Sequence, residues 1–307
     1  MSSGGSSTTA ILAALGANAG ITLAKFVGAV LTGSSSMLAE AMHSLADTAN
    51  EALLLLGKRR AAHPPDAVHQ FGYGRNRYFY SFVVALVLFT MGSLFAIDEG
   101  ITKIRRPEEL SSPVVAIAIL LIAMALETFS LLTARRESQP LKGRGSWWQF
   151  IRTSRNPELP VVLLEDSGAL VGLAFAFTGV GLTMLTGDAR WDGVGTLAIG
   201  ILLGVIAVVL IVEMKSLLIG EGATPDEERA IRGNLVDDTH FDRVIHLRTE
   251  YLAPDELLIA AKVAVRPGLT IDDVATAIDA AEDRVRAAVP AAGLMYLEPD
   301  LYRPDHR

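Results

Sequence analysis

The chain has 307 residues and no cysteine, and half of its residues are hydrophobic, with a mean hydropathy of +0.37. This composition is too apolar for an ordinary soluble enzyme, and the excess apolar surface is expected to face lipid. Without cysteine, a disulfide framework and a thiolate metal site are excluded. The net charge of −7 does not indicate a nucleic-acid partner, and we expect none, because the basic residues lie in short segments between apolar runs.

Six stretches are long and apolar enough to be membrane-spanning helices, each of which needs about 20 residues to cross a bilayer. We expect an all-α six-helix transmembrane bundle within residues 1–221, and we expect the first span to be a retained helix, because the N-terminal MSSGGSSTTA has no basic residue. The predicted spans are about 10–31, 36–57, 79–101, 113–134, 160–185 and 191–214.

The distribution of Lys and Arg predicts the orientation of these spans. Eleven such residues lie in segments 58–78 and 135–159, and four lie in the other three connections between spans. Because positive residues accumulate on the cytoplasmic side, both termini are expected in the cytoplasm, in a multi-pass protein of the cell inner membrane. Segment 135–159 also holds Trp147, Trp148 and Phe150 among basic residues, which is typical of a segment at the membrane interface.

Residues 222–307 are more polar and are predicted to form a small cytoplasmic domain. The sequence TPDE at 224–227 is a capping box with proline at the first helical position, which predicts a helix to about residue 238. The next elements are predicted to be strand, strand, helix and strand, at 241–251, 256–266, 270–289 and 294–297. This α-β-β-α-β order suggests a ferredoxin-like α+β domain, and so small a core favours dimerisation.

The second predicted span is unusually polar, with five polar side chains: Glu40, His43, Asp47, Asn50 and Glu51. An ionisable side chain at mid-bilayer costs about 2.5–3.5 kcal/mol, so several in one helix indicate a protein-lined or wet interior that uses them. His43 and Asp47 are four residues apart, so on a helix they share a face and can reach one ion. The alternative is a hydrogen bond that joins two helices, and the membrane setting favours the metal site.

A second group of ligands must come from another helix, and the fifth span offers Glu165 and Asp166 in LPVVLLEDSGALVG. From GSSSMLAEAMHSLADTANEALLLLG through HQFGYGR to LIGEGATPDEE, the chain resembles the cation diffusion facilitators. The resemblance implies a homodimer with six transmembrane helices and a cytoplasmic ferredoxin-like domain, which exchanges cytoplasmic Zn²⁺, Mn²⁺ or Fe²⁺ for protons. It also implies that His43, Asp47 and Asp166 belong to the transport site. The segments LLED and ETFSL are similar to the subgroup that includes the mitochondrial zinc transporter.

The fourth ligand departs from the family pattern, because Val162 stands where a second ligand from the fifth helix is expected. Glu165 adjoins Asp166 but points about 100° away on an ideal helix, so it would substitute only in a distorted helix. Asn18, Glu127 and water are the alternatives.

Two accessory sites of the family are also incomplete. In the loop after the second span, Asp66 and His69 occupy plausible ligand positions, but Tyr73 replaces a later histidine. In the terminal domain, His246 and Glu298 match two ligand positions, whereas Ala261 and Tyr296 fall where further ligands are expected. The intramembrane site therefore carries the metal hypothesis.

These patterns predict a transporter that exports a divalent metal in exchange for protons. The mixed nitrogen and oxygen ligands favour Zn²⁺ over Fe²⁺, Co²⁺ or Mn²⁺ as cargo, with no bound cofactor. One alternative is a membrane scaffold with a degenerate metal site that recruits partners. Another is an intramembrane metallohydrolase, but the chain has no H-E-x-x-H motif, and we expect no enzyme.

Overall fold

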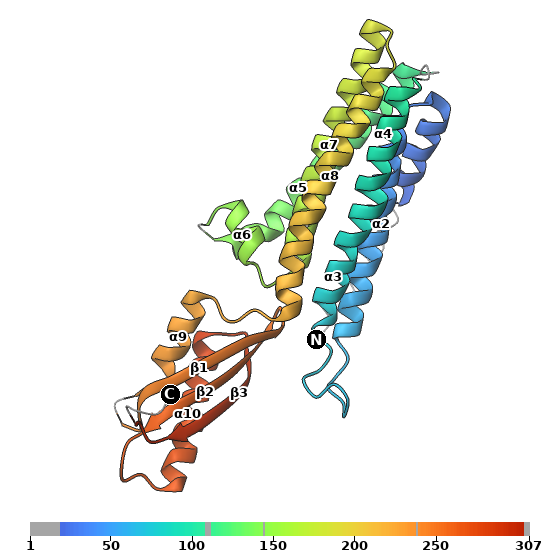
Figure 1. Ribbon diagram of the computed structural model, residues 1–307. Coiled ribbons are helices and arrows are strands. Elements are labelled where there is room, and N and C mark those ends of the chain that lie inside the picture. Colours follow the sequence, from blue (N-terminus) through green and yellow to red (C-terminus); the bar gives the residue numbers. More distant parts are fainter. Residues whose placement is uncertain (1–18, 108–111, 144, 238, 304–307) are drawn as a thin grey trace. The chain divides into compact units, whose positions relative to one another are not determined.

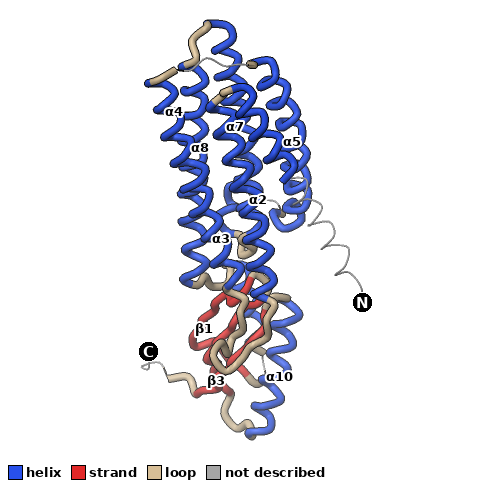
Figure 2. Tube along the Cα trace, turned by 90° about the vertical axis from the view of Figure 1, so that its right-hand side faces the viewer, coloured by secondary structure: helices blue, strands red, loops and turns tan. Residues whose placement is uncertain are grey.

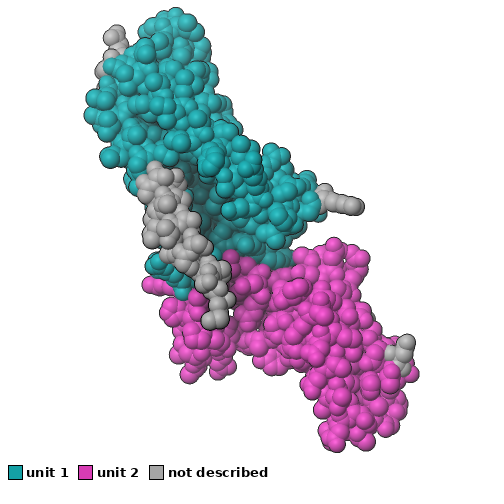
Figure 3. Space-filling view, turned by 180° about the vertical axis from the view of Figure 1, so that it is seen from behind, with its two compact units in different colours: residues 1–59, 79–214 teal, residues 60–78, 215–307 magenta. Residues whose placement is uncertain are grey.

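The computed structural model describes residues 19–107, 112–143, 145–237 and 239–303. The chain divides into two compact units, shown in two colours in Figure 3. Unit 1 comprises Met1–Arg59 and Phe79–Met214, and unit 2 comprises Arg60–Tyr78 and Lys215–Arg307. The loop 60–78 thus groups with the C-terminal residues. The domain boundary at residue 221 stays a prediction.

Unit 1 is helical throughout its described elements, and Figure 1 shows its long helices lying alongside one another. The helix Ala19–Thr32 comes first. It is followed by α2 (Ser35–Ala61), α3 (Asn76–Val87), the π-helical turn η1 (Leu88–Leu94), α4 (Phe95–Arg105), α5 (Pro113–Lys142), α6 (Trp147–Thr153), α7 (Glu158–Thr186) and α8 (Arg190–Ile219).

Four helical stretches of the described residues are long and apolar enough to cross a membrane: Asn76–Arg105, Pro113–Lys142, Glu158–Thr186 and Arg190–Ile219. They contain the last four predicted spans. The first predicted span is described only from residue 19, as a shorter apolar helix. The second, α2, has 27 residues but is not among these four apolar stretches. A bundle of six spanning helices therefore remains a prediction.

The segment expected at the membrane interface is also largely helical. α5 continues past the predicted span to Lys142, and the separate short helix α6 follows. Ser146 caps α6 by accepting a hydrogen bond from the Gln149 amide, which explains where this helix begins. Phe150 is buried against α5 and α7 residues, so α6 packs on these two helices.

Small residues let α8 approach its neighbours closely. A Cβ added at Gly100 in α4 would lie 2.6 Å from the Leu197 backbone nitrogen, and one at Gly200 would lie 2.7 Å from the Ile97 nitrogen. The Ser93 hydroxyl in η1 donates a 2.8 Å hydrogen bond to the Gly200 carbonyl. Such close backbone contact is a common means of helix association in membranes, where water provides no hydrophobic driving force.

A buried aspartate joins the start of α8 to the start of α2. The Asp192 carboxylate accepts hydrogen bonds from the Ser35 amide at 2.8 Å, the Ser34 hydroxyl at 2.9 Å and the Ser35 hydroxyl at 3.0 Å. The Ser36 hydroxyl donates to it as well. This carboxylate satisfies amides at the helix N-terminus, where a negative charge is favourable, and so fixes α2 in the bundle.

Unit 2 is a small α+β structure built from α9 (Pro225–Leu235), β1 (Phe241–Ala253), β2 (Glu256–Val265), α10 (Ile271–Ala288) and β3 (Ala292–Asp300). Both helices begin with capping boxes, at Thr224 and Thr270, and these local signals explain why the predicted elements are confirmed within a few residues. The predicted strands are confirmed too, and each observed strand bound lies within three residues of the predicted one.

The strands of unit 2 are red in Figure 2. Their sheet has the order β1-β2-β3, with β1 antiparallel and β3 parallel to β2. Alternate residues of β2, from Leu257 to Val263, are buried with residues of α9 and α10 in one core. Both helices therefore cover one face, and the intervening residues of β2 lie on the other. The three described strands agree only loosely with a ferredoxin-like sandwich.

Candidate functional site

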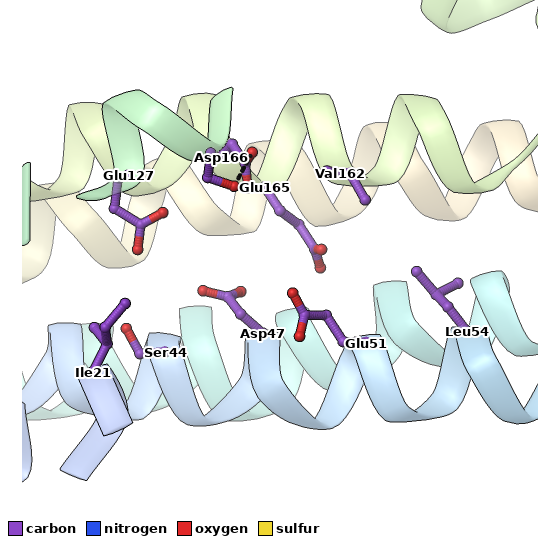
Figure 4. A pocket seen from close by; sticks show the side chains of 10 residues that line it. Ile21, Ser44, Asp47, Glu51, Leu54, Glu127, Val162, Glu165 and Asp166 are labelled. Carbon is purple, nitrogen blue, oxygen red and sulfur yellow. Dashed lines mark hydrogen bonds between the residues drawn. The ribbon is translucent and has the colours of Figure 1, made fainter. Parts of the chain in front are cut away.

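A polar cavity lies inside unit 1, between α2, α5 and α7, and has a volume of about 60 Å³. That is room for a few water molecules, since one needs about 10–15 Å³ by this measure. Figure 4 shows its lining, with acidic side chains of α5 and α7 pointing toward those of α2. The lining residues are Ile21, Ser44, Asp47, Glu51, Leu54, Glu127, Ser130, Val162, Glu165 and Asp166.

On α2, His43 and Asp47 lie together as their spacing predicts. The His43 Nδ1 atom is 3.5 Å from Asp47 Oδ1. His43 is fully buried, and neither ring nitrogen has a hydrogen-bond partner among the described residues. Buried polar atoms without a partner are uncommon and costly. This imidazole is therefore a candidate to bind a metal ion or to accept a proton. Asp47 lines the cavity, and His43 contacts Asp47 without lining the cavity itself.

On α7, both Glu165 and Asp166 line the cavity. The Asn50 side-chain amide donates a 2.6 Å hydrogen bond to Glu165 Oε1, and the Ser130 hydroxyl donates a 2.9 Å hydrogen bond to Asp166 Oδ2. The helix is regular from Glu158 to Thr186. The expected distortion of α7 is therefore not needed, because the longer side chain of Glu165 reaches the cavity from its own face of the helix.

Val162 lines the same cavity, one turn before Asp166. Among the described residues, no three His, Asp or Glu side chains are grouped closely enough to hold one metal ion. The structure thus places Asp47, Glu165 and Asp166 around one space and His43 against Asp47, without joining them in a single coordination shell. Of the other expected ligands, Glu127 lines the cavity, and Asn18 lies outside the described residues.

The site also contains a lysine that the sequence analysis missed. Lys25, in the helix Ala19–Thr32, is 1% exposed. Its ammonium donates a 2.7 Å hydrogen bond to the Ser44 hydroxyl and lies 3.3 Å from Glu40 Oε2 and 3.8 Å from Glu127 Oε1. A single lysine inside the apolar run GITLAKFVGAVL was the available signal, because an ionisable residue in a span needs a partner.

In the loop 60–78, the candidate ligand Asp66 is hydrogen-bonded to Tyr73. The Tyr73 hydroxyl donates a 2.6 Å hydrogen bond to Asp66 Oδ2, and the Val68 and His69 amides donate to Asp66 Oδ1. The Tyr73 hydroxyl, followed by these amides, lowers the pKa of Asp66 to about 2. Both carboxylate oxygens are therefore already engaged, and His69 Nδ1 is 3.7 Å away from Asp66. The Tyr73 hydroxyl thus already uses a carboxylate oxygen that a metal ion would need.

In the sheet of unit 2, Lys262 lies between the two candidate metal ligands, His246 and Glu298. His246, Lys262 and Glu298 are register partners across β1, β2 and β3. The Lys262 ammonium lies 2.9 Å from Glu298 and 3.1 Å from Asp300, and these two carboxylates raise the pKa of Lys262. The carboxylate that the sequence named as a candidate metal ligand is therefore paired with an ammonium.

The comparison with known proteins decides the family. A family model of the cation efflux transmembrane domain matches residues 11–219. The chain belongs to the cation efflux family. It is a multi-pass membrane protein, and the acidic cavity lies within the matched residues.

Several curated proteins are similar to this cation efflux chain. It is 38% identical over 225 residues to the mitochondrial proton-coupled zinc antiporter SLC30A9 of Xenopus laevis. The matched region is 72% of this chain and 40% of the relative. It is 29% identical over 234 residues to metal tolerance protein C4 of Arabidopsis thaliana, covering 75% and 51%. It is 32% identical over 137 residues to the zinc transporter ZitB of Escherichia coli, covering 44% of each. The chain thus spans about half or less of the length of these relatives.

Proposed function

We propose that this chain transports a divalent metal cation, Zn²⁺ first among the candidates, across a membrane in exchange for protons. The observation that carries the proposal is the polar cavity to which α2 and α7 each contribute acidic side chains, Asp47 on one side and Glu165 and Asp166 on the other. Membership of the cation efflux family and the names of the relatives support zinc as the cargo.

Exchange with protons follows from competition for the same atoms. An imidazole and a carboxylate bind metal only when deprotonated, so an arriving cation displaces the protons that the empty site holds. His43 and Asp47 supply one such pair, and Glu165 and Asp166 supply the second from α7. In this mechanism the side chains close on the ion as it enters and separate when protons replace it. The metal is cargo, and no catalytic step is required.

Nitrogen and oxygen ligands fit Zn²⁺, and they also admit Fe²⁺, Co²⁺ and Mn²⁺. Glu165 supplies the ligand that Val162 cannot, because it already reaches the cavity from a regular helix. We further propose a homodimer with six spanning helices, a ferredoxin-like unit 2 and both termini in the cytoplasm. The first relatives are named mitochondrial, which does not fit the cell inner membrane expected from the sequence.

Reconstitution tests this function directly. The purified chain is placed in proteoliposomes, a pH gradient is imposed, and zinc uptake and proton release are followed together. Zinc uptake that rises with the gradient and is lost in Asp47→Asn supports the proposal. A folded wild-type chain that moves neither ion, with or without the gradient, would favour the scaffold instead.

A further inference from the structure

Lys25 forms a buried cluster at one side of the cavity, and the proposed exchange does not use it. The cluster joins three elements, because Lys25 comes from the helix Ala19–Thr32, Glu40 and Ser44 from α2, and Glu127 from α5. The side chain of Lys25 is 2% exposed and that of Glu40 is fully buried. Glu40 also packs against α7, since a Cβ added at Gly172 would lie 2.7 Å from Glu40 Oε1.

The charges of this cluster bear on any cation in the cavity. Glu127 lines the cavity, and its carboxylate points toward α2 (Figure 4). It could therefore serve as a metal ligand, yet its Oε1 atom lies 3.8 Å from the Lys25 ammonium. In a low-dielectric interior an ammonium at this distance strongly stabilises the carboxylate, and it also repels a nearby dication. Both effects lower the affinity of the cavity for metal.

We propose that Lys25 is a positioning residue that keeps Glu127 out of the metal's coordination shell, and so sets an affinity weak enough for release. The inference rests on the proposed function, since it concerns how the same cavity handles its cargo. A transporter must bind its ion well enough to load it and weakly enough to let it go. The fixed ammonium meets the second requirement by holding Glu127, a carboxylate that lines the cavity, away from the ion.

The chain offers a matched control for this lysine. Lys103 in α4 is also buried, at 5% exposure, but its ammonium donates a 3.2 Å hydrogen bond to the Gly33 carbonyl, and it does not line the acidic cavity. Replacing Lys103 with methionine removes a buried ammonium of unit 1 without changing the charge around Glu127. The comparison therefore separates the effect of Lys25 on the cavity from the general effect of losing a buried lysine.

The test is zinc titration of the full chain in detergent, with zinc transport measured on the same variants in proteoliposomes. Lys25→Met should lower the zinc Kd about tenfold, and KM and turnover should fall together because release slows. Lys25→Arg, which keeps the positive charge, should retain the wild-type Kd, KM and turnover. Lys103→Met should leave the Kd within about threefold of wild type. In Lys25→Met/Glu127→Gln, the Kd should return to within about threefold of wild type, because the released carboxylate is gone.

A folded Lys25→Met with unchanged Kd would overturn the inference. If Lys25→Met does not fold, Glu127→Gln alone decides: a Kd within about threefold of wild type supports the inference, and a Kd raised more than about tenfold makes Glu127 a ligand and overturns it. Asp47→Asn in the same titration keeps the two proposals apart. Loss of zinc binding there with no effect of Lys25→Met leaves the proposed function intact and removes only the role of Lys25.

Discussion

Unit 1 and unit 2 each place a lysine among carboxylates, and the two arrangements differ in burial. In unit 1, Lys25 is 2% exposed at its side chain and faces Glu40 and Glu127. In unit 2, Lys262 is 25% exposed and faces Glu298 and Asp300. Buried charges need partners and respond strongly to a new charge, whereas exposed pairs are screened and contribute little.

The polar atoms around the two lysines also differ in burial and in hydrogen bonding. Beside Lys25, Glu40 Oε1 and both ring nitrogens of His43 are buried without a hydrogen-bond partner among the described residues. Around Lys262, Glu298 is exposed and Asp300 is partly exposed, so both carboxylates can be hydrated. The same residue types therefore form a buried charge cluster in unit 1 and a partly exposed ion pair in unit 2. Burial, and not residue type, separates the two arrangements.

The largest effect is expected from removing a charge in the buried region. Asp47→Asn should lower zinc transport by roughly a hundredfold or more, because it removes a ligand and a proton-binding group while keeping the side-chain volume. Zinc uptake by proteoliposomes measures the loss. Asp98→Asn is the control, since Asp98 is an exposed acidic residue of the Asn76–Arg105 stretch and should leave transport unchanged. Near-normal uptake by folded Asp47→Asn would remove this cavity as the transport site.

A smaller loss is expected at the ligand that the family pattern does not contain. Glu165→Gln should raise the zinc Kd about tenfold, because the amide oxygen still accepts the hydrogen bond from Asn50 but no longer carries a charge. Zinc titration in detergent measures it. A wild-type Kd would leave Glu127, Asn18 or water as the fourth ligand.

Val162→His sharpens the same question. Since Val162 lines the cavity, a histidine there could add a nitrogen ligand one turn from Asp166. This variant should bind zinc more tightly than wild type if water completes the shell, and it should change the Kd little if Glu165 already does.

In unit 2, neither bound metal nor the charge of Lys262 should contribute much to stability. Lys262→Met, or chelation of metal, should change hydrogen-exchange rates of the β2 amides in the full chain by less than about threefold, because exposed ion pairs contribute little. Phe241→Ala is the contrast: this fully buried side chain belongs to the core of unit 2, and losing it should cost about 3–5 kcal/mol and speed exchange strongly. Faster exchange in chelator that zinc reverses would instead indicate a metal site at His246 and Glu298.

The smallest effect is expected in the loop 60–78. The hydroxyl of Tyr73 is the largest cause of the lowered pKa of Asp66, so Tyr73→Phe should raise that pKa from about 2 toward its ordinary value of 3.8. Stability that depends on ionised Asp66 is present above about pH 4 and is lost as the pH falls through about 2. In the variant it is lost at higher pH. An NMR titration of the carboxyl carbon measures the shift, and an unchanged pKa would show that the backbone amides alone hold it down.

Much of the architecture could be predicted, because its signals are local. The apolar runs placed the long helices, and the capping boxes at Thr224 and Thr270 placed the helices of unit 2. The four-residue spacing of His43 and Asp47 predicted a shared helical face, and their side chains do lie 3.5 Å apart. Glu165 also lines the cavity from a regular α7, and its role as the fourth ligand stays a prediction.

By itself, the sequence determined the order of the helices and strands and the presence of a helix with several acidic residues, because periodicity, caps and apolar length act over a few neighbouring residues. Only the tertiary structure decided which charges meet. Lys25 pairs with Glu127, and Asp192 with the start of α2, although these partners are far apart in the chain. Partner choice for a buried charge depends on which helices pack together and on how deeply each side chain is removed from water, and neither quantity is encoded in local spacing.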